Sequence, residues 1–136
     1  MASSAIDRAL LALLSGDATL MALMPDGVYW DEAKPQAKRF VIVSLLSEVD
    51  GYMQGGRAWE DGLYLVKAVT LNAAATAIDA ADRIDLLLEG AQLIATGYTP
   101  MVTMGEERIR HTEVDEADDS VRWFHIGRHY RIVMST

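Results

Sequence analysis

The chain has 136 residues, is 51% hydrophobic and 24% charged, and carries a formal net charge of −8 at pH 7. This length suits one domain, and the acidic charge excludes broad electrostatic binding to nucleic acid, because contacts to phosphate depend on Lys and Arg. The chain has no cysteine, which excludes disulfides and cysteine metal sites, and no apolar run approaches the ~20 residues that a membrane helix needs.

Residues 3–24 predict a pair of helices. Ser4, followed by Asp7, is typical of a helix start, with an oxygen acceptor at the cap and an acid in the first turn. Gly16 is expected to end this helix, and Asp17 to cap a second, short one. The apolar residues that share one face of the first helix at helical spacing are Ile6, Leu10, Leu13 and Leu14.

Residues 28–71 predict three strands. A short strand is expected at 28–30 and longer strands at 40–46 and 63–71, where β-branched and aromatic residues are frequent. Residues 40–46 are apolar on both faces, which predicts a central strand covered on both sides. The 16 residues between the two longer strands, 47–62, contain four glycines and predict a mobile loop.

A long helix is expected over residues 73–89. Asn72 is a suitable cap residue, and Gly90 is a suitable stop. The apolar stripe that faces the core at helical spacing is predicted to be Ala77, Ala81, Ile84 and Leu88.

The last part of the chain, residues 101–134, predicts a long antiparallel hairpin joined at the acidic turn Asp115–Asp119. Arg and Glu alternate along it, which indicates charge pairing between the strands. Its arginines are Arg108, Arg110, Arg122, Arg128 and Arg131. The whole pattern predicts an α+β fold of one domain, residues 1–136. A mainly antiparallel sheet with a long C-terminal hairpin is packed against the N-terminal helix pair and the long central helix.

The chain offers no motif for catalysis or for a cofactor. His125 and His129 stand four residues apart on a predicted strand. That spacing separates them by ~13 Å, too far for one metal. His111 adds at most a pair with one of them. The acids from Glu113 to Asp119 lack the spacing of a calcium loop and are typical of a solvated turn. We therefore expect no metal, no cofactor and no enzyme activity.

The order of elements resembles the tail-completion family of long-tailed bacteriophages, the tail-terminator or head–tail joining proteins. The segments that carry the resemblance are "AIDRALLALLSGDATLMALM", "RFVIVSLLSE", "LYLVKAVTLNAAATAIDAADRIDLLLEG" and "RHYRIVM". The resemblance implies a structural protein of the virion, assembled in the host cytoplasm as a ring, usually a hexamer. Such a ring caps the tail tube and joins it to the head connector, and DNA passes through it without being read.

Two sets of residues are then candidates for function. Residues 47–62 are interpreted as a docking arm, because aromatic and Arg side chains are frequent at interface hot spots. The predicted interface residues are Tyr52, Met53, Gln54, Arg57 and Trp59. A channel lined by acids repels phosphate and leaves DNA free to slide. The candidate lumen acids are Glu113, Asp115, Glu116, Asp118 and Asp119, or alternatively Asp79, Asp82 and Asp85 on the outer face of the central helix.

Two alternatives stay open from the sequence. Tyr52 and Trp59 also fit a hairpin end whose aromatic rings fold back on the sheet. The whole chain also fits a monomeric adaptor or ligand-binding domain that uses an exposed sheet.

Overall fold

The computed structural model describes residues 3–135. Its helices are α1 (Ser3–Ser15), α2 (Ala18–Leu23) and α3 (Ala74–Leu88), and its strands are β1 (Val28–Trp30), β2 (Arg39–Met53), β3 (Gly56–Leu71), β4 (Thr99–Val114) and β5 (Arg122–Ser135). The predicted α+β class is confirmed. None of the helices in the described chain has the length and hydropathy needed to cross a membrane.

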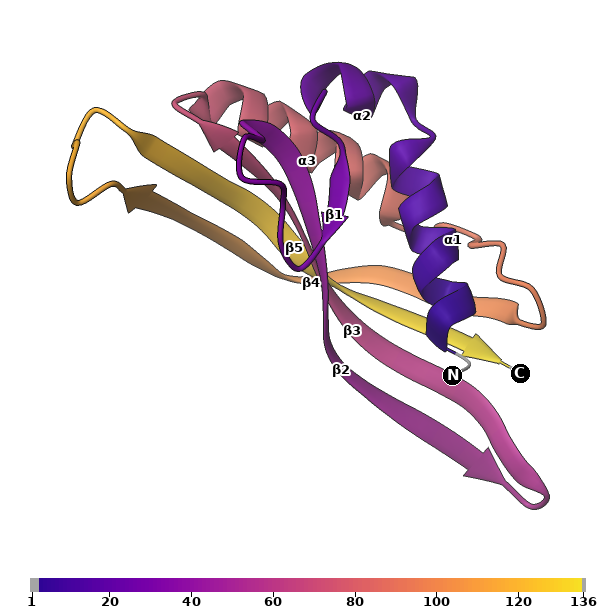
Figure 1. The fold of residues 1–136 in the computed structure, drawn as a ribbon. Coiled ribbons are helices and arrows are strands. Elements are labelled where there is room, and N and C mark those ends of the chain that lie inside the picture. The colour runs from indigo at the N-terminus through magenta and orange to yellow at the C-terminus, as the bar shows by residue number, and fades with distance from the viewer. Residues whose placement is uncertain (1–2, 136) are drawn as a thin grey trace.

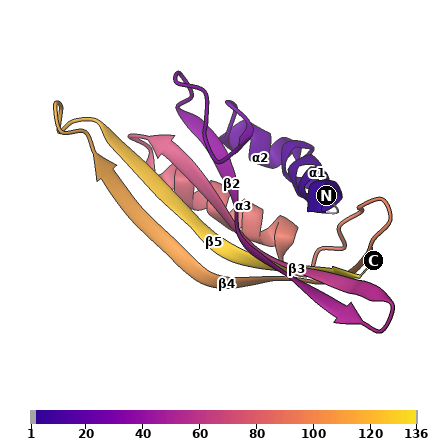
Figure 2. The same cartoon turned by 60° about the horizontal axis from the view of Figure 1, so that its bottom comes forward.

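The strands form one twisted sheet in the order β1-β2-β3-β5-β4. The short β1 pairs in parallel with β2, and all other neighbours are antiparallel. The three helices lie over one face of this sheet (Figure 1). The β2–β3 and β4–β5 hairpins turn at opposite ends of the sheet (Figure 2).

Apolar side chains are buried on both faces of the sheet. On the helix side, Tyr64, Val66 and Ala68 of β3 belong to the main core, together with apolar residues of all three helices. On the other side, Phe40 and Val69 belong to a smaller cluster, against which Trp123 and Ala33 pack. Residues 40–43 of β2 lie between these two clusters, as predicted for a strand covered on both sides. For the rest of the predicted strand the expectation is wrong, because Leu45 and Leu46 are 40% and 46% exposed.

The helix ends agree only in part with the sequence-based expectations. Asp17 caps α2 as predicted, because its carboxylate accepts a hydrogen bond of 2.9 Å from the Leu20 amide. The predicted cap at Ser4 is wrong, because α1 already includes Ser3. The cap position of α3 is Ala73 and not Asn72.

Asn72 has a different role. Its φ is 54°, and its side-chain oxygen accepts a hydrogen bond of 2.8 Å from the Arg122 amide, which ties the start of α3 to β5. The buried stripe of α3 contains Ala80 in place of the predicted Ala81. The role of Asn72 and the burial of Ala80 both depend on tertiary contacts, which the helical spacing of apolar residues does not predict.

The predicted loop over residues 47–62 is wrong. Strands β2 and β3 continue through it as a paired ladder, with only Gln54 and Gly55 between them. The glycines have specific positions in this hairpin. Gly55 and Gly56 have φ angles of 104° and 135°, which suit a tight turn and strain other residues. The glycines of residues 47–62, which were interpreted from the sequence as a source of mobility, are therefore required by the turn and by the packing of the paired strands.

Candidate functional site: the β2–β3 arm

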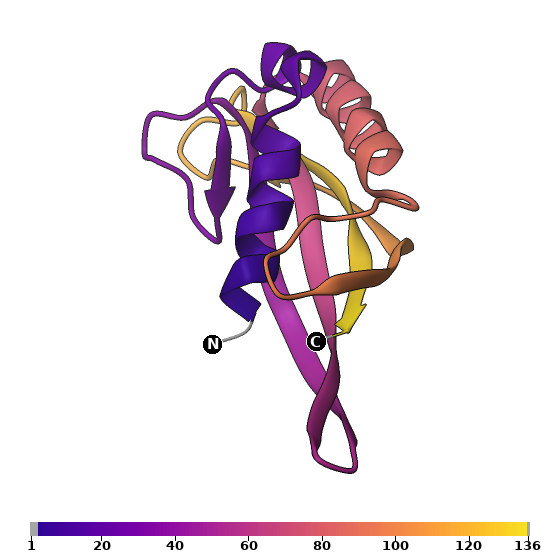
Figure 3. The ribbon, with the colours of Figure 1, turned by 90° about the vertical axis from the view of Figure 1, so that its right-hand side faces the viewer.

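The far end of the β2–β3 hairpin forms an arm, residues 44–62, whose two-stranded tip, residues 52–58, extends beyond the body of the protein (Figure 3). Strand β1 pairs with β2 only at residues 41–43. From Ser44 onward, the outer edge of β2 has no partner strand in the described chain. Strand β3 pairs with β5 from Trp59 onward, so the tip consists of β2 and β3 alone.

The tip brings together most of the predicted interface residues. Tyr52 is 65% exposed and Met53 is 67% exposed, although both are large side chains. Gln54 follows in the exposed turn. Arg57 pairs with Tyr52 across the two strands. A hydrogen bond with the Tyr52 hydroxyl, followed by the charge of Asp50, raises the pKa of Arg57.

Trp59 has an internal role in the arm. It lies opposite Gly51 across the two strands. A Cβ atom added to Gly51 would overlap the indole ring of Trp59, so the ring lies directly on this glycine. Trp59 as a whole residue stays 37% exposed. Of the two aromatic side chains, Trp59 packs on the arm itself and Tyr52 is the more exposed.

Three carboxylates gather on the helix side of the arm. Glu48 and Asp50 come from β2 and Glu60 from β3, and one oxygen of each lies within 4.8 Å of the others. Arg57 reaches Asp50 at 3.3 Å and Glu60 at 3.2 Å. We call Glu48, Asp50 and Glu60 the arm acids. Sequence reasoning missed them because it placed them in a loop, although an alternating Glu48-x-Asp50 pattern on a strand would have put both on one face.

The negative charge of the arm acids is only partly balanced by neighbouring positive charge. Glu60 is only 2% exposed, and a buried oxygen of Asp50, Oδ1, has no hydrogen-bond partner. Burial, followed by the charges of Glu60 and Asp50, raises the pKa of Glu48. Among residues 3–135, Arg57 is the base that forms ion pairs with this cluster, and it pairs with Asp50 and Glu60 but not with Glu48.

The candidate lumen acids lie at the opposite end of the sheet. Several of them shape their own turn. The Asp115 carboxylate accepts hydrogen bonds from the amides of Ala117 and Asp118 at 2.8 and 3.2 Å. The Asp118 carboxylate accepts from the hydroxyl and amide of Ser120, and these bonds lower its pKa. The turn is exposed, and Glu116 lies within it.

The histidines form at most a pair, as expected. The rings of His111 and His125 stack with their centroids 4.2 Å apart. Glu113, at the edge of the acidic turn, contacts Nε2 of His125 at 2.9 Å. Burial is the main cause that lowers the pKa of His125, and the bond to Glu113 opposes it. His129 instead lies near Glu107, at 4.0 Å.

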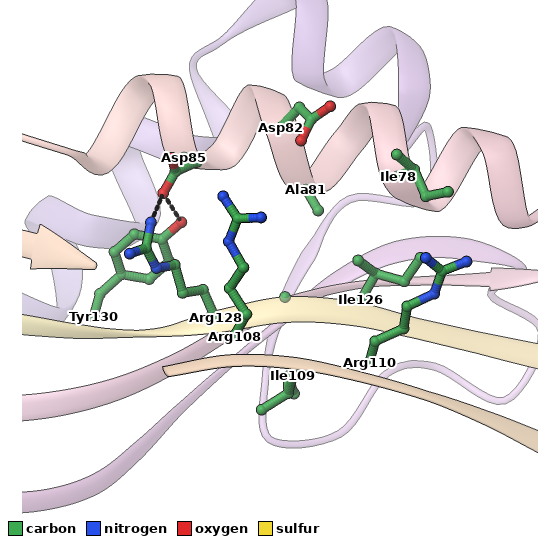
Figure 4. Close-up of a pocket in the computed structure, with 11 residues that line it drawn as sticks. Ile78, Ala81, Asp82, Asp85, Arg108, Ile109, Arg110, Ile126, Arg128 and Tyr130 are labelled. Atoms are coloured by element: carbon green, nitrogen blue, oxygen red, sulfur yellow. Dashed lines mark hydrogen bonds and ion pairs between the residues drawn. The ribbon is translucent and has the colours of Figure 1, made fainter. Parts of the chain in front are cut away.

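A groove of about 200 Å³ lies between α3 and the β4–β5 hairpin. Figure 4 shows Arg108 and Arg110 pointing from β4 toward α3, whereas Ile109 points away. Asp85 of α3 accepts hydrogen bonds from Arg128 and Tyr130 at 3.0 and 2.9 Å. Asp85 therefore faces the sheet, and the prediction that it belongs to the outer acidic face of α3 is wrong.

The predicted charge pairing between β4 and β5 holds at only one end of the hairpin. Arg131 bonds to Glu106 on β4 at 2.7 Å, and also to Asp61 on β3. Arg108 stands opposite another arginine, Arg128. No ion pair joins Arg108 or Arg110 to a residue of the described chain, and both side chains are exposed. The molecule thus has an acidic cluster near one sheet edge and two unpaired arginines at the other.

No protein-family model and no curated protein sequence matches the chain significantly. The fold is similar to that of a chain from the solved "Virion of native gene transfer agent (GTA) particle", with a TM-score of 0.72 and 23% identity over 99% of this chain and 98% of that chain. A second solved structure has a TM-score of 0.59 and 16% identity, over 97% of this chain and 96% of the other. These likenesses establish the fold over almost the full length.

Proposed function

We propose that the protein is a structural component of a phage-type virion and acts as a tail terminator. In this proposal several copies, six by the family resemblance, form a ring that caps the tail tube and joins it to the head connector. The ring assembles in the host cytoplasm and has no enzymatic role. Two independent likenesses support this: the element order resembles the tail-completion proteins, and the fold is similar to that of a chain in a gene transfer agent virion.

The arm is the observation that carries the proposal. A long, exposed edge strand with apolar side chains is a site for pairing with another chain, and monomeric proteins usually protect such edges. Here the β2 edge is open from Ser44, and Tyr52 and Met53 are exposed at its tip. A ring requires two different surfaces on each copy, because its contacts are heterologous. Strand β4, the other edge of the sheet, provides the second surface.

The charge of the chain is compatible with DNA passing through such a ring. A net charge of −8 opposes phosphate binding, so the duplex slides without being held. In the proposed ring the acidic turn from Glu113 to Asp119 is a candidate lining of the channel, and so are Asp79 and Asp82 on the exposed side of α3. The turn is the better supported of the two, because Asp85 faces the sheet.

The test is assembly as a function of concentration. Sedimentation velocity over a concentration series, with electron microscopy of the largest species, should show annular particles. Changing Tyr52 and Met53 together to Ser should weaken assembly by at least about tenfold in concentration, because burying each side chain contributes ~1.5–3 kcal/mol. Trp59 is left unchanged because it packs on Gly51 within the arm.

The matched control is Ile94→Ser. Ile94 is also a large apolar side chain and is 93% exposed, but it lies outside the arm. Its variant should assemble like the unchanged chain. Equal effects of the arm and control variants would refute the role of the arm. A chain that stays monomeric at every concentration would favour the monomeric adaptor or ligand-binding domain.

A further inference from the structure

We infer that the ring contact is a pairing between the β2 edge of one copy and the β4 edge of the next copy, in which Glu48 lies opposite Arg110 and Asp50 lies opposite Arg108. This inference rests on the proposed function, and it specifies that β4 of a neighbouring copy covers the β2 edge of the arm. The two strands would join neighbouring sheets into one.

Both edges are open over similar lengths. Within residues 3–135, the edge of β2 lacks a partner strand from Ser44 to Met53. In the same described part of the chain, strand β4 pairs only with β5, so its other edge faces outward. Residues 89–90 bond to that edge at Thr103 and Gly105, and the Glu106 carbonyl accepts a hydrogen bond from Arg128, which leaves residues 107–114 open. Eight residues of β4 and ten of β2 are thus available.

The charged groups lie on the same side of the sheet. Glu48 pairs with Gly62 and Asp50 with Glu60, on the helix side of the arm. Arg108 and Arg110 also point to the helix side (Figure 4). When two copies share one sheet with their helices on the same side, acids and arginines therefore meet on one face. Opposite charges directly across a strand pair are stabilising.

One antiparallel register satisfies both charge pairs at once. Three antiparallel steps separate β2 from β4 within a copy, so the two strands run in opposite directions. Copies around a ring axis that lies roughly along the strands keep these directions, and the contact is antiparallel. In such a pair, two steps forward on one strand match two steps back on the other. Placing Glu48 opposite Arg110 therefore places Asp50 opposite Arg108.

The same register also joins two apolar side chains. It places Val49 opposite Ile109, and both point to the side without helices, since each alternates with the charged residues of its strand. Val49 is 67% exposed in the single copy, and Figure 4 shows Ile109 pointing away from α3. The end of β4 then falls near Ser44, just past Val43, where β1 stops. The short β1 and the neighbouring β4 thus occupy successive parts of one edge.

The register also fixes how neighbouring copies are offset. Within one copy, Arg110 is level with Val41 through Ile126 and Ala68. Across the inferred contact, Arg110 is level with Glu48. Each copy is therefore shifted along its strands by about seven residues relative to the last, and a closed ring accommodates such a shift by tilting its strands against the ring axis, as barrels do.

The experiment uses two charge-reversed variants. One carries Arg108→Glu and Arg110→Glu, and the other carries Glu48→Lys and Asp50→Lys. Each alone places like charges across every contact, and should assemble at least about tenfold more weakly. Mixed in equal amounts, they should assemble again, because an alternating ring restores opposite charges at both kinds of contact. Arg122→Glu, an exposed arginine outside the register, is the control and should assemble normally.

A covalent test is available because the chain has no cysteine. Directly opposed strand residues have Cα atoms ~4.5–5.5 Å apart, a distance that a disulfide spans. Val49→Cys with Ile109→Cys should therefore give a ladder of linked copies on oxidation, and Val49→Cys with Ile94→Cys should not. Three results would overturn the register alone, provided that the unchanged chain assembles. They are normal assembly of the charge-reversed variants, no recovery of assembly when these variants are mixed, and no ladder from the Val49→Cys, Ile109→Cys chain. A chain that never assembles would overturn the proposed function as well.

Discussion

An ion pair between Asp17 and Arg83 connects α2 to α3, and it allows a quantitative test of the helical layer. The Arg83 guanidinium donates two hydrogen bonds to the Asp17 carboxylate, at 2.8 and 2.7 Å. Asp17 also caps α2 through the Leu20 amide. The informative change is Asp17→Asn, because the amide oxygen of Asn still caps the helix while the charge is lost.

The size of the effect follows from the pKa. The bond with Arg83 is the main reason why the pKa of Asp17 lies at about 2 and not at 3.8. At ~1.36 kcal/mol per pKa unit, this difference corresponds to ~2.4 kcal/mol. The side chains of Arg83 and Asp17 are 29% and 15% exposed, so screening by solvent reduces the expected contribution to the free energy of unfolding to ~1–2 kcal/mol.

The sign of the pH dependence is fixed by linkage. The folded-state pKa is depressed, so the stabilisation is complete above pH 3.8 and is lost as the pH falls toward about 2. Urea unfolding at neutral pH should show that Asp17→Asn is less stable than the unchanged chain by ~1–2 kcal/mol, and the gap should close in acid. The control Asp79→Asn, an exposed residue of α3, should stay within ~0.5 kcal/mol. An Asn variant of unchanged stability at neutral pH, or a gap that persists in acid, would refute the reasoning.

Two glycine substitutions test the packing of the sheet. Gly51→Ala should displace the Trp59 ring that lies on this glycine, at a cost of about 1–2 kcal/mol to the arm. Amide exchange should then become faster in residues 47–53, and Trp emission should shift to the red; no such shift should occur in a Trp59→Phe background. Gly127→Ala should cost about 2–3 kcal/mol in urea unfolding, because the new Cβ would overlap the Val66 carbonyl, which cannot move aside. Unchanged stability there would contradict the close approach of β3 and β5.

The elements with clear hydrophobic periods were predictable, and the arm was not. The C-terminal hairpin, the long central helix and the Asp17 cap followed from local patterns that tertiary structure did not override. In the arm the pattern misleads. Gly51 is there to admit the Trp59 ring, and Gly55 with Gly56 forms the turn. A sequence does not distinguish a glycine that gives mobility from one that makes room for a neighbour.

The segment that forms the candidate site was predictable from the sequence, but the contacts between its side chains were not. Tyr52 and Met53 were predicted as interface residues, and both side chains are exposed. The ion pairs of Arg57 with Asp50 and Glu60 depend on the β2–β3 register, which brings residues of two strands onto one face. The unpaired state of Arg108 and Arg110 depends on which carboxylates the neighbouring elements present to them. Strand β5 contains neither Asp nor Glu, and Asp85, one of two α3 carboxylates that line the groove, is already bonded to Arg128 and Tyr130.

The charges at the two edges also bear on which assembly the chain prefers. If two arms paired edge to edge, Glu48 of one copy would lie near Asp50 of the other, and the acids would repel. If two β4 edges paired, Arg108 and Arg110 would face each other in the same way. Both two-fold contacts are therefore disfavoured by like charges, whereas the inferred contact between β2 and β4 places opposite charges together. In the proposed assembly, edges that repel their own kind and attract each other disfavour a closed dimer and favour the repeated head-to-tail contact from which a ring is built.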